Sequence, residues 1–476
     1  MFLRQIYHDG LAQASYLIGC QATGEAIVID PNRNIEQYLA AAQRAGLRIT
    51  AVTETHIHAD YLSGARELAQ RTGARLYLSD MGTAEWKYAY AAEAGATLLH
   101  DGDRIMVGNV RLEVLHSPGH TPEHIAFLVT DSAHACVPMG LVSGDFVFVG
   151  DVGRPDLLER AAGVTGTMDA AARQLFRSLQ RFRELPDYLQ VWPGHGAGSA
   201  CGKALGAVPQ STVGYEKEIN WAFDIRAEGA FVDAVLAGQP DPPPYFAQMK
   251  RLNKLGPAPR PASLPTQLAF ERLAPALAGE MVVVDTRSAD AFAATHLPGA
   301  INIPAGDGFL TWAGWLLPYD RPLALIVDPT QLAVVRDELV LIGLDQVAGY
   351  WAPNVLEEWR ATGHAIAWYD RQSAATLQPT IAQNGVLLLD VRTPSEYAAG
   401  HIPNSYNIPL GRLAAQLHTL PAGQPAMVYC QGASRSPIAA SILQAHGWES
   451  VTEMNDGFEG WQAAGAPVEC SYDHFE

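Results

Sequence analysis

The sequence predicts a multi-domain α/β protein, and three observations lead to this fold class. Strand and helix patterns alternate through the first half, a proline-rich stretch follows, and the second half contains an internal repeat. The 476 residues correspond to three domains at roughly 150 residues each. Hydrophobic residues make up 48% of the chain, which is enough to build a packed core in each domain.

The charge balance narrows the classes of partner. Acidic residues outnumber basic ones by 50 to 32, so the net charge is −18. Such a chain repels phosphates, which argues against nucleic-acid binding and against an anionic membrane surface. No apolar run is long enough to span a membrane, the N-terminus lacks the apolar stretch of a signal peptide, and five scattered cysteines indicate no disulfide framework. We therefore expect a cytoplasmic protein.

In the first half, short apolar runs predict strands and segments of helical spacing predict helices. The expected strands are 25–30, 49–55, 74–80, 125–130, 140–150 and 188–195, with a hairpin over 104–119 that turns at Gly108-Asn109. The expected helices are 34–46, 61–73 and one that starts after Thr167 as its N-cap. Several of these strands end in polar clusters, which is typical of a site built on strand-end loops.

Four such clusters contain histidine or aspartate. They are THIHAD with His56, His58 and Asp60, SPGHTPEH with His120 and His124, SGDF with Asp145, and WPGHG with His195. Imidazole and carboxylate ligands together suit borderline divalent metals. A lone histidine is more often a structural group, but four ordered clusters predict a metal centre.

A proline-rich stretch and a repeat organise the rest of the chain. The segments PDPPP (240–244) and GPAPRPASLP (256–265) mark a domain boundary. The segment VVVDTRSADAFAATHLPGAINIP, from Val282, then recurs as LLLDVRTPSEYAAGHIPNSYNIP, from Leu387. The matching pairs include Asp285 and Asp390, Arg287 and Arg392, His296 and His401, and Trp359 and Trp461. We interpret the two copies as α/β domains of one kind.

The second copy contains a cysteine in a distinctive place. In AMVYCQGASRSP, Cys430 lies between an apolar strand and a helix, followed by Arg435 and Ser436. Backbone N–H groups at a helix N-terminus, together with Arg435, favour a reactive thiolate and would stabilise a persulfide. The spacing from Cys430 to Arg435 also fits a tyrosine phosphatase, so the loop alone is ambiguous. In the first copy the matching positions are Asp328, Ala333 and Val334, which leaves no nucleophile and no anion-binding arginine.

The first domain resembles the metallo-β-lactamase fold, αββα, in the branch of glyoxalase II and the persulfide dioxygenases. The usual HxHxDH motif has Tyr61 in its last position here, so the second metal site of that superfamily lacks a nitrogen ligand. The persulfide dioxygenases hold one Fe(II) per domain, and the resemblance implies His56, His120 and Asp145 as its ligands. It implies that His58, Asp60 and His195 orient ligands or bind substrate. The same ligands also bind zinc and manganese.

Two further features of that domain have a structural and a functional interpretation. Cys201 is either a small buried thiol or a thiol near the metal that holds sulfane sulfur, and we weigh the two equally. The DVGRPDL stretch (151–157) resembles a segment of the same enzymes, but an Arg154–Asp156 loop brace explains it at least as well.

The repeats resemble rhodanese domains, the first degenerate, which favours sulfur transfer over phosphatase chemistry at Cys430. The predicted domains are a metallo-β-lactamase-like domain over 1–255, a degenerate rhodanese-like domain over 256–372 and an active one over 373–476. The chain as a whole resembles the fused persulfide dioxygenase–sulfurtransferases.

This resemblance implies that a low-molecular-weight thiol persulfide, of glutathione, coenzyme A or bacillithiol, reacts with dioxygen and water to give sulfite and the thiol. Cys430 would exchange sulfane sulfur between persulfide, sulfite and thiosulfate. Two alternatives stay open: a thioester hydrolase of the glyoxalase II type, and a sulfur-carrier protein whose first domain is inactive. Homo-oligomers are common in such enzymes, and the sequence neither requires nor excludes one.

Overall fold

The computed structural model describes residues 1–162, 166–203, 205–381, 385–421 and 423–470. By its internal contacts the chain forms two compact units. The first comprises Met1–Pro261 and Leu339–Gly343, and the second comprises Ala262–Glu338 and Leu344–Glu476. Within the described residues, no helix combines the length and the apolar character needed to cross a bilayer.

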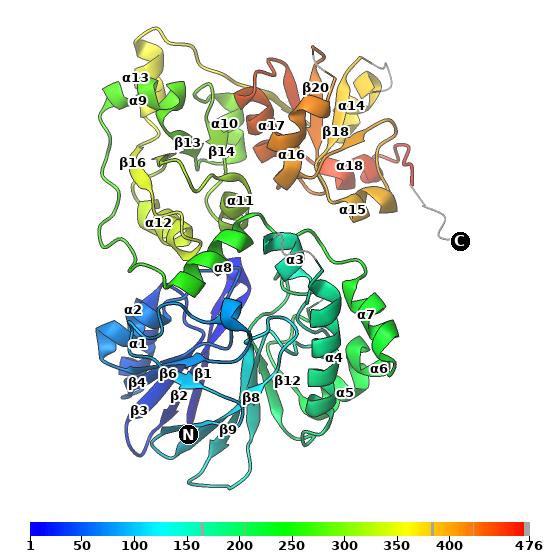
Figure 1. The fold of residues 1–476 in the computed structure, drawn as a ribbon. Coiled ribbons are helices and arrows are strands. Elements are labelled where there is room, and N and C mark those ends of the chain that lie inside the picture. Colours follow the sequence, from blue (N-terminus) through cyan, green and yellow to red (C-terminus); the bar gives the residue numbers. More distant parts are fainter. Residues whose placement is uncertain (163–165, 204, 382–384, 422, 471–476) are drawn as a thin grey trace. The chain divides into compact units, whose positions relative to one another are not determined.

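The first unit contains two mixed sheets (Figure 1). One has the order β1 (Phe2–His8), β2 (Gln13–Cys20), β3 (Glu25–Ile29), β4 (Arg48–Thr53), β5 (Arg75–Ser79) and β6 (Thr97–Leu99). The other has the order β12 (Ser211–Thr212), β11 (Gln190–Pro193), β10 (Gly140–Gly144), β9 (Ile125–Asp131), β8 (Val110–His116) and β7 (Arg104–Val107). Alternate residues of β3 and β9, such as Ile27 and Phe127, bury their side chains in one cluster between the two sheets.

Helices cover the outer faces of both sheets. Helices α1 (Ile35–Arg44) and α2 (Ala65–Thr72) belong to a second apolar cluster on the first sheet. Helices α4 (Met168–Arg183) and α7 (Glu228–Leu236) pack on the other sheet, with α5 (Val213–Ile219) and α6 (Trp221–Asp224) beside them. The remaining helices are α3 (Leu157–Ala162) and α8 (Tyr245–Leu255). The expected αββα arrangement is therefore confirmed.

Local predictions are confirmed with three corrections. The hairpin forms, with Val107 opposite Val110. Helix α2 begins at Ala65 rather than at Tyr61, and β10 ends at Gly144, where a φ of 53° turns the chain sharply. Thr167 does not cap α4 with its side chain; the Glu159 carboxylate accepts the backbone N–H of Thr167 instead, at 3.0 Å.

The second unit contains two parallel sheets built in the same order. The first repeat has β14 (Ile301–Asn302), β13 (Val282–Asp285), β15 (Leu323–Ile326) and β16 (Val347–Trp351), side by side in that order. The second repeat has β19 (Tyr406–Asn407), β18 (Leu387–Asp390), β20 (Ala426–Tyr429) and β21 (Val451–Met454), with β17 (Asp370–Gln372) added beside β21. The strand order thus repeats together with the sequence.

The two repeats share one hydrophobic core, because Val283 and Ile326 of the first and Leu389 and Val428 of the second lie in a single buried cluster. The first repeat contains α9 (Leu273–Pro275), α10 (Ala289–Ala294), α11 (Phe309–Leu316), α12 (Leu332–Leu341) and α13 (Val355–Ala361). The second contains α14 (Ala374–Ile381), α15 (Pro394–Ala399), α16 (Leu413–Gln416), α17 (Ser436–Ala445) and α18 (Gly457–Ala463). The domain boundaries at 255/256 and 372/373 stay predictions.

Candidate functional site

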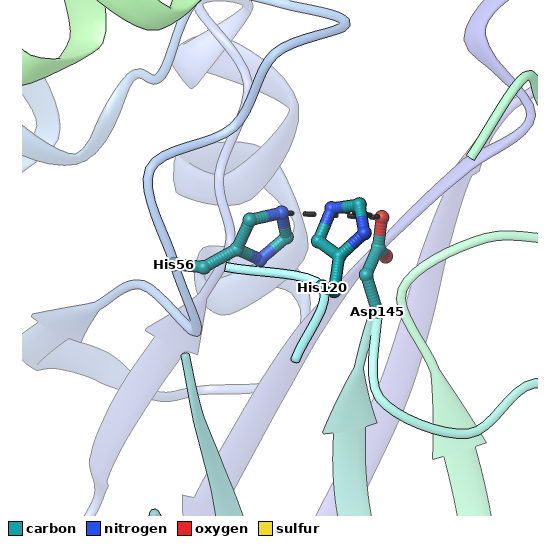
Figure 2. A group of neighbouring side chains, drawn as sticks. All are labelled: His56, His120 and Asp145. Carbon is teal, nitrogen blue, oxygen red and sulfur yellow. Dashed lines mark ion pairs between the residues drawn. The ribbon is translucent and has the colours of Figure 1, made fainter. Parts of the chain in front are cut away.

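The strand-end clusters of the first unit meet in one place. His56 follows β4, His120 lies in the loop after β8, Asp145 follows β10, and His195 follows β11. All four side chains are buried. Figure 2 shows His56, His120 and Asp145 pointing toward one another from separate loops.

The distances within this group suit a single metal ion. Nε2 of His56 lies 3.9 Å, and Nε2 of His120 lies 3.6 Å, from Oδ2 of Asp145. Bonds of about 2.0–2.2 Å to one metal place its donor atoms roughly 3–4 Å apart. All three donor atoms lie within 4.8 Å of one another.

The hydrogen bonds of His120 leave one ring nitrogen free for a metal. Its Nδ1 lies 3.0 Å from the carbonyl oxygen of Arg154, and a carbonyl only accepts, so Nδ1 carries the proton. The lone pair is therefore on Nε2, which faces Asp145. Arg154 is itself held by two hydrogen bonds, of 2.8 and 2.7 Å, to the carboxylate of Asp156. The Arg154–Asp156 brace thus positions His120 through the backbone.

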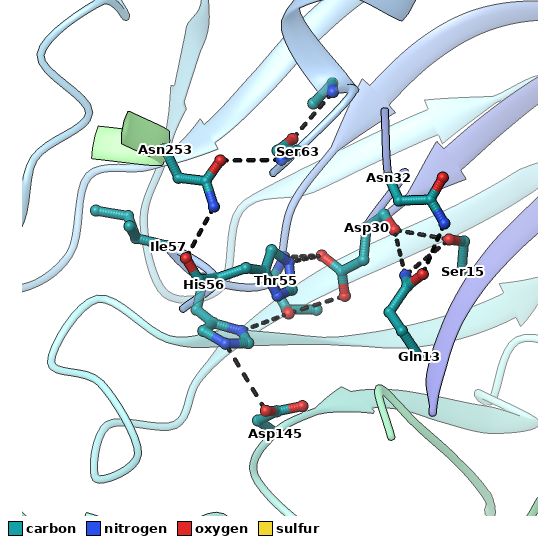
Figure 3. Close-up of polar contacts among 12 residues, drawn as sticks. Gln13, Ser15, Asp30, Asn32, Thr55, His56, Ile57, Ser63, Asp145 and Asn253 are labelled. Atoms are coloured by element: carbon teal, nitrogen blue, oxygen red, sulfur yellow. Dashed lines mark hydrogen bonds and ion pairs between the residues drawn. The ribbon is translucent and has the colours of Figure 1, made fainter. Parts of the chain in front are cut away.

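His56 is oriented by a second chain of hydrogen bonds (Figure 3). The Thr55 hydroxyl donates to Oδ2 of Asp30 at 2.9 Å, so its oxygen accepts from Nδ1 of His56, also at 2.9 Å. The lone pair of His56 is therefore on Nε2, as in His120. Burial, followed by the nearby His58, lowers the pKa of His56 well below its ordinary value, which keeps the ring neutral and able to bind a metal.

Asp145 contributes one free carboxylate oxygen. Its Oδ1 accepts from Nδ1 of His195 at 2.7 Å, while Oδ2 has no hydrogen-bond partner in the described part of the chain. Its backbone N–H donates to Nε2 of His124 at 3.1 Å, which fixes the turn after Gly144. A buried oxygen without a partner is costly unless something binds it, and a cation beside two free imidazole nitrogens would do so.

His58, Asp60 and His195, the other predicted residues of the site, form ion pairs with carboxylates or with each other. Nε2 of His58 pairs with Oδ1 of Asp30 at 3.0 Å, and Nε2 of His195 pairs with Oδ2 of Asp60 at 2.7 Å. Burial opposes the charge on His58, but Asp30 outweighs it and raises the pKa to about 9. Both nitrogens of His195 are thus held by carboxylates, whereas His58 is held by Asp30 through Nε2 and its Nδ1 has no hydrogen-bond partner among the described residues.

Tyr61 does not replace the missing histidine. Its hydroxyl donates to the carbonyl oxygen of Asp30 at 3.3 Å, and its ring lies against His58 at a centroid distance of 4.5 Å. Burial raises the pKa of Tyr61 well above its ordinary value, so the group is a neutral phenol. These contacts turn the hydroxyl toward the first sheet.

Cys201 lies beside the site. Its sulfur, a carboxylate oxygen of Asp60 and a nitrogen of His195 lie within 4.8 Å of one another, and the thiol is buried. Burial first, and then the charges of Asp145 and Asp60, raise the pKa of this thiol well above its ordinary value. Its resting form is therefore a protonated thiol.

Sequence reasoning missed Asp30 and Thr55, which orient the site without belonging to a histidine cluster. One signal for Asp30 was available: it ends the strand-like run EAIVID just before Pro31, at the same kind of strand end as the other groups. The contribution of Arg154 had no such signal, because its backbone carbonyl makes the contact.

The second unit presents Cys430 directly after β20, in a loop that leads into α17. The backbone N–H of Arg435 donates to Sγ at 3.3 Å, and the oxygen of Ser436 lies 3.5 Å from Sγ. The Arg435 guanidinium makes two hydrogen bonds, of 2.8 and 2.7 Å, to the Glu396 carboxylate. Arg435 thus reaches the sulfur by its backbone, while its side-chain charge is shared with Glu396.

The corresponding turn of the first repeat is different. Asp328 follows β15, and its Oδ1 accepts from the backbone N–H and the hydroxyl of Thr330 at 2.8 and 2.7 Å. The carboxylate thus closes its own turn. No side chain at this turn offers a thiol or a guanidinium.

Comparisons with known proteins agree with the fold of the first unit and with that of the second repeat. The model of the metallo-beta-lactamase superfamily matches residues 8–195, and that of the rhodanese-like domain matches residues 373–464. A hydroxyacylglutathione hydrolase from Rhodospirillum rubrum is 30% identical over 242 residues, which are 50% of this chain and 80% of that protein. One from Gloeobacter violaceus is 34% identical over 184 residues, 38% of this chain and 62% of that protein.

A solved structure extends the similarity. The metallo-beta-lactamase from Staphylococcus aureus subsp. aureus COL is 46% identical, with a TM-score of 0.69, and the match covers 99% of that chain and 74% of this one. That share of this chain is more than the first unit contains, so the likeness continues into the second. The chain therefore belongs to the metallo-beta-lactamase superfamily and contains a rhodanese-like domain that follows its metallo-beta-lactamase domain in the sequence.

Proposed function

We propose that this protein is a non-haem iron persulfide dioxygenase coupled to a sulfurtransferase. The observation that carries the proposal is the set of three free donor atoms: Nε2 of His56, Nε2 of His120 and Oδ2 of Asp145. Two imidazoles and one carboxylate on one face are the ligands of mononuclear iron oxygenases, and they leave coordination positions open.

The state of the neighbouring groups favours one metal over two. A second metal would need Asp60 and His195, but these bind each other at 2.7 Å, and His195 also binds Asp145. Nε2 of His56, the first His of the HxH motif, is free, while Nε2 of His58, the second, is paired with Asp30. A hydrolase with two metals would have to break several of these buried charged contacts.

When bound by His56, His120 and Asp145, Fe(II) would supply open coordination positions for dioxygen and a persulfide and a path for electrons from the sulfur to dioxygen. The net reaction converts a thiol persulfide, dioxygen and water into the thiol and sulfite, so that the terminal sulfur is oxidised and dioxygen is reduced. The residues of this chain orient the ligands: Arg154 and Thr55 fix the two imidazoles, and His195 holds Asp145.

Cys430 would carry sulfane sulfur in the second unit. Its terminal persulfide sulfur would be attacked by sulfite, which releases thiosulfate and leaves the Cys430 thiolate; the reverse step loads the cysteine from thiosulfate. Backbone N–H groups such as that of Arg435 stabilise the negative sulfur. Two linked sites raise the effective concentration of the shared sulfite.

A second candidate is a thioester hydrolase of the glyoxalase II type. It is favoured by the names of the two relatives given above, both hydroxyacylglutathione hydrolases. It would require metal-activated water and thus a metal at the same His56–His120–Asp145 group, with Asp60 and His195 released to bind a second ion.

The test uses the full chain, loaded with Fe(II) under anaerobic conditions and given glutathione persulfide. We expect about one iron per chain, oxygen uptake and the appearance of sulfite. His120→Ala should lose both iron and oxygen uptake. His134→Ala is the matched control, because that side chain is exposed.

The competing hydrolase predicts a different pattern. In that case the protein would bind two metals per chain, hydrolyse S-lactoylglutathione and consume no oxygen with any thiol persulfide. That result would replace the dioxygenase proposal with the hydrolase.

A further inference from the structure

A buried carboxylate lies beneath the Cys430 loop. Glu453 is in β21 and its side chain is fully buried. Its Oε1 accepts from the hydroxyl of Ser436 at 2.7 Å, and its Oε2 is paired with Nε of Arg371. A buried carboxylate in an apolar sheet is expensive, so both partners are needed to hold it.

The proton of Ser436 decides what this serine can do for the cysteine. A hydroxyl has a single proton, and Ser436 uses it to donate a hydrogen bond to the Glu453 carboxylate. Its oxygen is therefore left as an acceptor toward Cys430, whose Sγ–H donates to it at 3.5 Å. In this state Ser436 stabilises the thiol and offers nothing to a thiolate, which is instead met by the backbone N–H of Arg435.

Arg371 links Glu453 to the other repeat. β17 pairs with β21 in parallel, with Arg371 directly opposite Glu453. The same guanidinium forms an ion pair with Asp290, which lies in the first turn of α10 in the first repeat. Asp290, Arg371, Glu453, Ser436 and Cys430 thus form one continuous chain of contacts.

We propose that Glu453 and Arg371 are positioning residues that set the reactivity of Cys430 through Ser436, and that Asp290 lets the first repeat take part. The proposal rests on Cys430 as the sulfur carrier. It gives the repeat without a nucleophile a function: it holds one end of the charge chain that ends at the cysteine of its neighbour. Glu453 favours the resting thiol, and Arg371 offsets that effect.

Other charged groups near the loop form separate contacts. They are Arg435 with Glu396, Arg392 with Asp390, and Glu459, which accepts from the side chain of Gln431. None of these groups contacts Glu453 or Arg371 among the hydrogen bonds and ion pairs of the described residues. Their contribution is therefore the same in variants of the chain from Asp290 to Ser436.

The test measures the rate at which iodoacetamide alkylates Cys430 in the full chain, as a function of pH, by mass spectrometry of the Cys430 peptide. Glu453→Gln removes a negative charge that is separated from the sulfur by the Ser436 hydroxyl, so the pH midpoint of alkylation should fall by about one unit. Arg371→Gln removes a positive charge and should raise the midpoint. Asp290→Asn should lower it by a fraction of the Glu453→Gln shift.

The decisive result is that Glu453→Gln and Arg371→Gln shift the pH midpoint of alkylation in opposite directions. Both Glu453→Gln and Arg371→Gln break the same ion pair, so loss of packing alone would change alkylation in the same direction in both. Shifts of one sign, or no shift in proteins that keep their circular dichroism, would overturn the proposal. Glu449→Gln is the matched control, because this exposed glutamate lies just before β21 and should leave the profile unchanged.

Asp290→Asn keeps the proposal testable if the buried variants fail to fold, since the Asp290 side chain is 88% exposed. An unchanged profile in this variant would remove the first repeat from the mechanism. Because alkylation needs no sulfur substrate, these outcomes are independent of whether the protein proves to be a sulfurtransferase.

Discussion

In both repeats of the second unit, the aspartate that ends strand β13 or β18 binds an arginine two residues later. Nη2 of Arg287 lies 2.7 Å from Oδ2 of Asp285, and Nη2 of Arg392 lies 2.7 Å from Oδ2 of Asp390. Asp328 follows β15 in one repeat, and Cys430 follows β20 in the other. The first repeat thus keeps the aspartate–arginine pair that holds the fold, which we call the frame, although it has no cysteine in the matching loop.

Other recurring residues also serve the frame. Nδ2 of Asn302 donates to the backbone oxygens of Asp285 and Arg287, and Nδ2 of Asn407 makes the same two bonds in the second repeat. Nδ1 of His296 and of His401 each contacts the carbonyl oxygen four residues earlier. The repeated motif therefore serves the fold, whereas the two repeats differ in the loops after β15 and β20.

The largest effect should come from the loop. Cys430→Ser should reduce transfer of sulfur from thiosulfate to cyanide by at least about 100-fold, because the loop between β20 and α17 contains no second thiol. Asp328→Ala should leave the rate unchanged. Substantial activity in the Cys430→Ser protein would show that the two repeats do not differ in the way we describe.

Replacing the arginine of the aspartate–arginine pair should destabilise either repeat. Arg392→Met leaves the carboxylate of Asp390 buried without its partner, which should cost about 3–5 kcal/mol. Arg287→Met should cost roughly half as much, because the Arg287 side chain is 14% exposed whereas that of Arg392 is 2% exposed. Hydrogen exchange of the β13 and β18 peptides measures the two effects separately, and equal protection in both variants would contradict this ranking.

A smaller and equal effect is expected at the two matched tryptophans. Nε1 of Trp359 donates to the carbonyl oxygen of Ala365 at 3.0 Å, and Nε1 of Trp461 donates to that of Pro467 at 2.7 Å. Replacement by Phe removes one hydrogen bond in each case, at about 1 kcal/mol. Urea unfolding of the two variants should give similar losses, and a loss in only one would show that the frames are not equivalent.

The smallest expected effect is a pH dependence of the stability that only the second repeat should show. Burial opposes the charge on Glu396, but Arg435 and Thr393 outweigh it and hold its pKa at about 2, below the ordinary 4.5. The matching positions of the first repeat are Ala291 and Ala333, which form no such pair.

Because the folded-state pKa of Glu396 is depressed, its stabilisation is present above pH 4.5 and is lost as the pH falls toward 2. The side chain is 31% exposed, so we expect less than about 1 kcal/mol. Glu396→Gln should flatten the acid dependence of unfolding between these pH values. If the wild type and the variant lose stability in parallel, the pair does not contribute.

Much of the fold could be predicted from the sequence, because alternating apolar patterns and glycine-containing turns are local signals. The hairpin at Gly108, the strands that end before His56 and His195, and the repeat from Asp285 to Asp390 are examples. The limits of single elements were less predictable, as the start of α2 and the end of β10 show. There, close tertiary packing decides where a regular backbone stops.

By itself, the sequence determined which residues are candidates for chemistry: the histidine clusters with Asp145, and Cys430 after its strand. Only the tertiary structure decided which atoms are free. The lone pair on His56 depends on Asp30, that on His120 depends on the carbonyl oxygen of Arg154, and the proton of Ser436 depends on Glu453. Each hydroxyl or imidazole proton goes to the nearest acceptor, and those acceptors come from segments that only folding brings together.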